Sequence, residues 1–201
     1  MAKPRKKSLS TKRLLTEAAF HAIHSGGFQA AGLTAILAET GLTKGALYHH
    51  FPSKMELGYA VVEGPLRDYL NDWWLDPLDG QADPLEALAS VIASRLVRDV
   101  PEMLVRGCPL NNLAQEMAPV DEGFRSRIEV LYRDWRRGLA KALRHGQHAG
   151  TVDTGIEVDT TAAFIIAALQ GAFSQAKNAQ DLGVFHQCLT GLNEYLNGLR
   201  P

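Results

Sequence analysis

The sequence predicts an all-α protein with an N-terminal helix-turn-helix head and a larger C-terminal helical domain. Apolar residues recur at helical spacing along almost the whole chain, and no alternating run typical of a strand appears. Residues 1–55 hold eight Lys and Arg against two Asp and Glu, a net charge of +6. The remainder holds 13 basic and 20 acidic residues, a net charge of −7. A basic end on an acidic body favours a nucleic-acid module carried on a larger domain, although a basic tail can also serve solubility alone.

The N-terminal elements are expected in the following order. Residues 1–9 are expected to form a basic, disordered arm, and residues 10–55 a three-helix DNA-binding domain. Ser10 can cap a first helix that ends at Gly26-Gly27. Two short helices separated by a tight turn are expected in LTAILAETGLTKGALYHHFPSK, residues 33–54.

Residues 56–201 are expected to form a helical domain that binds an effector and dimerises. Its helices are expected from Ser53 to about Trp74, from Pro84 to a point before Pro101, from Pro109 to Pro119, over 122–148, over about 157–178 and over about 184–198.

Composition limits the class of protein further. The basic N-terminus is followed by no apolar run, which argues against a secretory signal. The longest apolar stretch, Ala162 to Leu169, is too short to span a membrane. Two cysteines form neither a disulfide framework nor a zinc site. We therefore expect a soluble cytoplasmic protein with reduced thiols.

The second short helix of the 33–54 corner has the composition of a DNA-reading helix. Leu42, Leu47 and Phe51 are its apolar anchors, and small, cationic and aromatic polar residues lie between them. Such residues suit contact with phosphates and base edges in a groove. The alternative is an ordinary helical corner with a solvated basic face.

GLTKGALYHHFPSK resembles the recognition-helix signature of the TetR family of bacterial transcriptional regulators, and AAFHAIHSGGFQAAGLTAILAETG resembles that family's first two helices. The resemblance covers about residues 10–60. It implies base and phosphate contacts by Lys44 and Tyr48, and close approach of the backbone at Gly45 and Ala46. Gly32 stands where the family usually has a hydroxyl residue, and Thr34 is the nearest substitute. Thr43, His49 and Lys54 would mostly touch the DNA backbone.

Two C-terminal helices carry more apolar surface than a domain of this size buries easily. The helix over 157–178 contains AAFIIAAL, which is apolar on all sides, and the last helix has a wide apolar stripe. A two-fold four-helix interface between subunits would cover both, as it does in the resembled family, and an internal core helix is the alternative. The residues expected at this interface are Phe164, Ile166, Leu169, Phe185, Leu192 and Leu196.

Cys108 is the candidate sensor. It precedes Pro109 at an expected helix N-terminus, with Arg106 nearby, and both features lower the pKa of a thiol. A small buried residue is the alternative. Cys188 is expected mid-helix on the apolar stripe, where desolvation would make it less reactive than Cys108.

GCPLNNLAQEM and LQGAFSQAK resemble a TetR subgroup of repressors that answer electrophiles, reactive chlorine or acrylate. The resemblance implies that Cys108 and Lys177 form the sensor, although Pro109 and Asn111 depart from the usual residues. Trp135 is a candidate for lining a ligand pocket, with a core position as the alternative.

These observations favour a dimeric, ligand-responsive transcriptional regulator, in the first place a repressor. Its expected partners are a pseudopalindromic duplex operator, a small-molecule or electrophile inducer and a second copy of the chain. No membrane, cofactor, metal or enzymatic activity is expected; the pairs His21/His24 and His145/His148 lack a clustered third ligand. The alternative is a small helical ligand-binding protein or enzyme with a vestigial head, which a salt-sensitive shift of duplex DNA would exclude.

Overall fold

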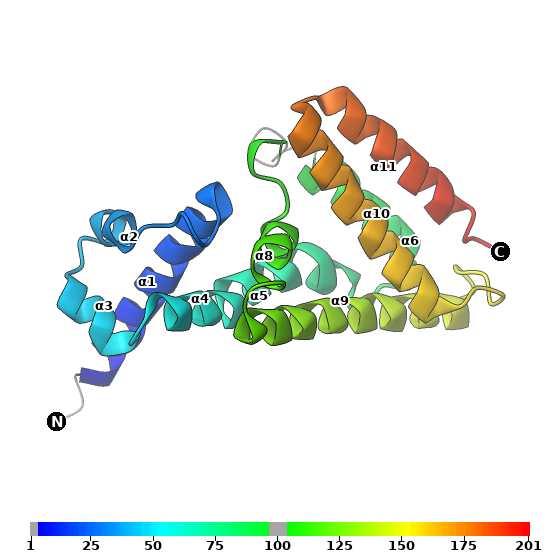
Figure 1. Ribbon diagram of the computed structural model, residues 1–201. Coiled ribbons are helices and arrows are strands. Elements are labelled where there is room, and N and C mark those ends of the chain that lie inside the picture. Colours follow the sequence, from blue (N-terminus) through cyan, green and yellow to red (C-terminus); the bar gives the residue numbers. More distant parts are fainter. Residues whose placement is uncertain (1–3, 97–103) are drawn as a thin grey trace. The chain divides into compact units, whose positions relative to one another are not determined.

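The structure is a computed structural model that describes residues 4–96 and 104–201 (Figure 1). Every regular element in these ranges is helical, which confirms the predicted all-α class. None of the described helices is long and apolar enough to span a bilayer. The chain forms two compact units, one of Met1–Asp68 with Pro109–Glu129 and the other of Tyr69–Cys108 with Val130–Pro201. The expected DNA-binding segment 10–55 lies within the first unit, which also takes a later part of the chain.

The first unit contains the helix-turn-helix. Its elements are α1 (Pro4–Gly26), α2 (Leu33–Thr40), α3 (Lys44–His50), α4 (Lys54–Glu63), the start of α5 (Pro65–Leu70), α8 (Pro109–Met117) and the start of α9 (Glu122–Ala149). Its core is built from fully buried apolar side chains of successive helices, among them Leu15, Leu47, Phe51, Leu57 and Phe124.

The first helix begins earlier than expected. Residues 4–9 are helical and continuous with α1, so Ser10 is not the helix cap. The sequence offers no breaker after Pro4, and proline suits the first turn of a helix. The end of α1 is as predicted, because Gly27 follows with φ +86°, a conformation that favours glycine.

The second unit is a helical body. Its elements are the end of α5, the π-helical turn η1 (Asn71–Leu75), the 3₁₀ turn η2 (Asp76–Leu78), α6 (Pro84–Val91), η3 (Ile92–Leu96), the rest of α9, α10 (Val158–Ala179) and α11 (Leu182–Asn197). α10 and α11 lie side by side and antiparallel (Figure 1). The predicted helix end before Pro101 falls outside the described residues.

The long helix expected from Ser53 to Trp74 is interrupted. Ser53 caps α4 as predicted, and its hydroxyl accepts a hydrogen bond from the Glu56 amide at 3.1 Å. α4 ends at Glu63, however, and α5 begins anew at Pro65. Gly64 between them lies outside the helical region, with φ −116° and ψ −104°. Proline removes a backbone donor and glycine disfavours the helix, which explains the break.

The predicted dimer residues are mostly core residues of the single chain. Phe164 is 50% exposed, but the other five are buried between α10, α11 and their neighbours. The body of one chain already covers these five side chains, so they leave little surface for a second copy. The five residues are Ile166, Leu169, Phe185, Leu192 and Leu196.

The outward side of this helix pair has a different composition. Phe164 of α10 packs against Tyr195 of α11 with 4.7 Å between ring centroids. Ala167 is exposed one turn after Phe164. A side-chain Cβ built at Gly171 or Gly191 would meet nothing within 4 Å. The outward side therefore combines one aromatic pair with small residues.

Candidate functional site

The predicted helix-turn-helix corner is present as α2, a turn and α3. Gly41 follows α2 with φ +65°, in the left-handed region that the tight turn requires. Thr43 caps α3 because its hydroxyl oxygen accepts the Ala46 N–H at 3.2 Å. Gly32 precedes α2 and makes no side-chain cap. Leu47 is fully buried and fixes α3 to the unit's core.

The residues predicted to meet DNA lie mainly on the solvent side of this corner. Lys44 and Tyr48 are both exposed and, four residues apart, lie on the same face of α3. Tyr48 is 51% exposed, which is unusual for a large aromatic side chain. Ala46 is half-buried. The others on this exposed surface are Thr34, Thr43, Gly45 and His49.

Lys54 has a partner that the sequence did not predict. Its Nζ donates a hydrogen bond to the Gln29 carbonyl oxygen at 3.0 Å. The same ammonium lies 4.9 Å from the centroid of the Phe28 ring, in a cation–π contact. Lys54 is half-buried and is held against the α1–α2 turn rather than extended into solvent.

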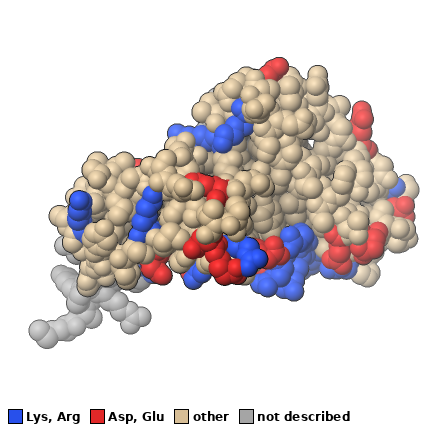
Figure 2. All heavy atoms as spheres, in the orientation of Figure 1, with Lys and Arg blue, Asp and Glu red and all other residues tan. Residues whose placement is uncertain are grey.

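Several basic side chains elsewhere are paired with acidic ones. On the face in Figure 2, Lys and Arg lie next to Asp and Glu along α9. In that helix Arg127 contacts Glu63, Lys141 contacts Asp79 and Arg144 contacts Asp159. Lys44, in contrast, has no ion-pair partner among the described residues. Its charge is therefore available to a phosphate or a base.

Cys108 is a buried thiol, with 3% of its surface exposed. Gln170 of α10 donates from Nε2 to its Sγ at 3.6 Å. Gln170 is itself buried, and its Oε1 has no hydrogen-bond partner. Cys188 is half-buried, so the expectation that it is the less accessible thiol is wrong for the single chain.

The other two predicted sensor residues lie in the same unit. Lys177 is half-buried and comes two helical turns after Gln170, about 10 Å further along the same side of α10. Trp135 is 2% exposed and packs against Trp74 with 5.4 Å between ring centroids. Trp135 thus has the environment of a core residue.

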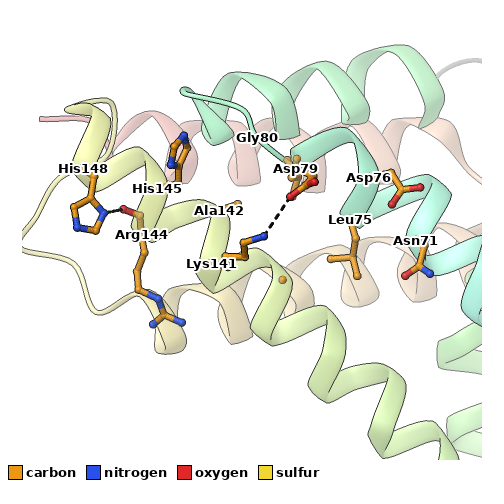
Figure 3. Close-up of a pocket in the computed structure, with 12 residues that line it drawn as sticks. Asn71, Leu75, Asp76, Asp79, Gly80, Lys141, Ala142, Arg144, His145 and His148 are labelled. Carbon is orange, nitrogen blue, oxygen red and sulfur yellow. Dashed lines mark hydrogen bonds and ion pairs between the residues drawn. The ribbon is translucent and has the colours of Figure 1, made fainter.

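The second unit contains a cavity of about 650 Å³ between the η1–η2 segment and α9. Figure 3 shows Lys141 directed to Asp79 across it, with an Nζ–Oδ1 distance of 3.3 Å. None of the predicted sensor residues lines this cavity. Its polar lining residues are Asn71, Asp76, Asp79, Lys141, Arg144, His145 and His148.

One histidine of each pair has another partner. His21 Nδ1 lies 3.4 Å from a Glu39 carboxylate oxygen, and His148 Nδ1 lies 2.8 Å from the Arg144 carbonyl oxygen. Within residues 4–96 and 104–201, no group of three or more His, Cys, Asp or Glu residues is arranged to hold a metal ion.

Sequence reasoning missed two residues at these sites, Glu116 and Gln170. The carboxylate of Glu116 accepts hydrogen bonds from the backbone amides of Phe28 and Gln29, both at 2.8 Å. The partners are far apart along the chain, so no local pattern indicates the contact. Gln170 lies in an apolar helix, and its polar side chain there was the available signal.

The second helix of the corner is anchored in the core and exposes basic and aromatic side chains, and a larger helical body follows it. This arrangement defines a helix-turn-helix DNA-binding regulator. Residues 15–61 match the family described as "Bacterial regulatory proteins, tetR family". Residues 84–192, more than half of the chain, match "Tetracyclin repressor-like, C-terminal domain". The chain belongs to the TetR family of transcriptional regulators.

Individual relatives agree with this assignment. The transcriptional repressor DhaR of Mycobacterium sp. (strain GP1) is 25% identical over 170 residues, which cover 85% of this chain and 84% of DhaR. The transcriptional regulator AcuR of Cereibacter sphaeroides is 29% identical over 155 residues, 75% of this chain and 69% of AcuR. The crystal structure of a TetR regulator from Chloroflexus aurantiacus is 26% identical and covers 96% of each chain with a TM-score of 0.81.

Proposed function

We propose that this protein is a dimeric repressor that leaves a pseudopalindromic operator when a small molecule or an electrophile acts on its second unit. The exposed face of α3, with Lys44 and Tyr48 above the buried Leu47 anchor, is the observation that carries the proposal. Two such helices, about one helical turn of DNA apart, would read neighbouring major grooves. The repressor DhaR among the relatives supports repression over activation.

Binding to duplex DNA is expected to weaken steeply with salt. A dimer with two basic heads would make on the order of six to ten phosphate contacts, and each one releases counterions. The operator is first selected from random duplexes with the purified protein. Fluorescence anisotropy on the selected duplex, at a series of salt concentrations, then gives the log–log slope. A flat slope would argue for the alternative of a vestigial head.

The dimer interface is proposed on the outward side of α10 and α11. Phe164 and Tyr195 form its aromatic part, and Ala167, Gly171 and Gly191 allow close approach of helices from a second copy. Large apolar side chains exposed beside small residues favour such packing. Dimerisation of TetR regulators supports this placement.

The sensor is proposed at Cys108, with Gln170 and Lys177 on the neighbouring side of α10. The chain passes from the second unit into the first at the Cys108–Pro109 bond, so α8 is the segment on which a change at Cys108 would act first. The hydrogen bond from Gln170 Nε2 joins Cys108 to α10, so modification of the thiol would also disturb this helix. The sequence likeness to electrophile- and acrylate-responsive repressors supports the chemistry.

Alkylation with N-ethylmaleimide is expected to release DNA from the wild type and from Cys188→Ser, but not from Cys108→Ser. We expect operator affinity to fall about tenfold or more in the two responsive proteins, a typical allosteric coupling. Mass spectrometry of the alkylated protein identifies the labelled thiol. Normal release from Cys108→Ser would make a reversibly bound small molecule the better account of induction. Lys177→Met is expected to blunt the response to oxidants.

A further inference from the structure

The turn between α1 and α2 is held by a carboxylate from a distant part of the chain. Glu116 of α8 accepts the Phe28 amide with Oε2 and the Gln29 amide with Oε1, each at 2.8 Å. Hydrogen bonds from two backbone donors to one carboxylate are charge-assisted and fix direction as well as distance. A Cβ built at Gly27 would lie 3.0 Å from the same carboxylate. The turn and Glu116 are therefore in close contact.

Lys54 contacts the same turn from α4. Its Nζ donates to the Gln29 carbonyl oxygen at 3.0 Å, so the N–H and the C=O of this one residue are held by side chains of opposite charge. Both charged groups thereby gain backbone partners. The turn is thus fixed by α8 and by α4, rather than by hydrogen bonds within its own residues alone.

The Phe28 side chain anchors the turn in the core. Its ring is 4% exposed and meets the Phe124 ring edge-on, at 4.7 Å between centroids. A Cβ at Gly58 would lie 2.5 Å from the Phe28 ring, so α4 needs glycine there. Tyr59 packs on Phe124, and its hydroxyl donates to Asp121 at 2.9 Å. Burial, followed by the bond to Asp121, raises the Tyr59 pKa, so this hydroxyl stays a donor at neutral pH.

The turn leads straight into the DNA-reading corner. Gly32, four residues after Phe28, precedes α2, and α3 follows α2 after a tight turn. The direction of the turn therefore sets where α2 starts. We propose that Glu116 is a positioning residue for DNA recognition: its carboxylate holds the α1–α2 turn and thereby orients α2 and α3 toward the operator. This inference rests on the proposed function as a DNA-binding regulator.

Glu116→Gln is the first variant, with Glu122→Gln as the matched control. Both remove one negative charge from the first unit, and Glu122 is exposed and paired only locally, with Arg125. Charge removal alone strengthens binding to any duplex. We call the two hydrogen bonds from the turn to Glu116 the clamp. Loss of the clamp is expected instead to lower affinity for the selected operator about tenfold, with affinity for random duplex retained. Glu116→Asp keeps the charge but shortens the side chain, and it is expected to behave like Glu116→Gln.

Amide hydrogen exchange of Phe28 and Gln29 in the free protein tests the clamp without DNA. Exchange at both amides is expected to rise about tenfold in the Glu116 variants and to stay unchanged in Glu122→Gln. Unchanged exchange in a folded Glu116 variant would overturn the clamp, whatever the DNA result. A parallel loss of operator and random-duplex affinity would show a structural role only and overturn the positioning. A wild type that prefers no duplex would instead defeat the proposed function, while exchange would still report on the clamp.

Discussion

Replacing Lys44 by Ala is expected to lower affinity for the selected operator by about 30-fold or more, while affinity for random duplex falls much less. Lys44 is exposed on α3, one turn from Tyr48, and has no ion-pair partner among the described residues. A base contact contributes about 1–3 kcal/mol of discrimination. A two-fold dimer loses the contact twice, so the effect on the operator is doubled in free energy.

Lys141→Ala is the matched control. Lys141 is also exposed, but it belongs to the second unit and pairs with Asp79 at 3.3 Å. Fluorescence anisotropy at one fixed salt concentration compares both variants on the selected operator and on random duplex. An equal loss of affinity for both duplexes would indicate that Lys44 contacts only a phosphate and not a base. Wild-type affinity and discrimination in Lys44→Ala would rule out α3 as the reading helix.

Ala167→Glu is expected to convert the dimer into single chains at micromolar concentration. Ala167 is exposed on α10, one turn after Phe164 and one turn before Gly171. At a two-fold interface each substitution buries two unpaired carboxylates, which costs several kcal/mol. The protomer itself should fold normally, because the side chain points to solvent in the single chain. Light scattering measures the molar mass, which is compared with the 22.0 kDa of one chain.

Thr190→Glu is the control, since Thr190 is exposed on the side of α11 away from Gly191 and Tyr195. Cys188 supplies a second readout. It lies one turn before Gly191, and an interface there would shield it from reagents. Ala167→Glu should therefore accelerate maleimide labelling of Cys188, and Thr190→Glu should not. A stable dimer of Ala167→Glu with unchanged Cys188 labelling would place the interface elsewhere.

Local signals predicted the helices well. Glycine at the end of α1, Ser53 at the start of α4 and Pro109 at the start of α8 act through backbone conformation and capping, which depend on near neighbours. The Gly64-Pro65 break was also readable, because proline lacks a backbone donor, but one long helix was predicted across it from its Ser53 cap.

Tertiary partners were not predictable in the same way. The apolar stripe of α11 is equally compatible with packing on α10 and with packing on a second copy, and Leu192 and Leu196 proved to be core residues. Lys54 was expected on DNA because a lysine beside a recognition helix suits phosphate. Its contact with Gln29, like that of Glu116, joins residues whose proximity depends on the whole fold.

The discontinuous make-up of the first unit limits how this protein can be recombined with others. A chimera that joins residues 1–55 to a foreign effector body would lack Gly58, Glu116 and Phe124, which surround Phe28. Its DNA-reading helices would be present, but the turn before them would have lost its carboxylate and its aromatic cover. A working hybrid therefore has to carry residues 56–68 and 109–129 along with the head, and effector specificity would be exchanged in residues 69–108 and 130–201.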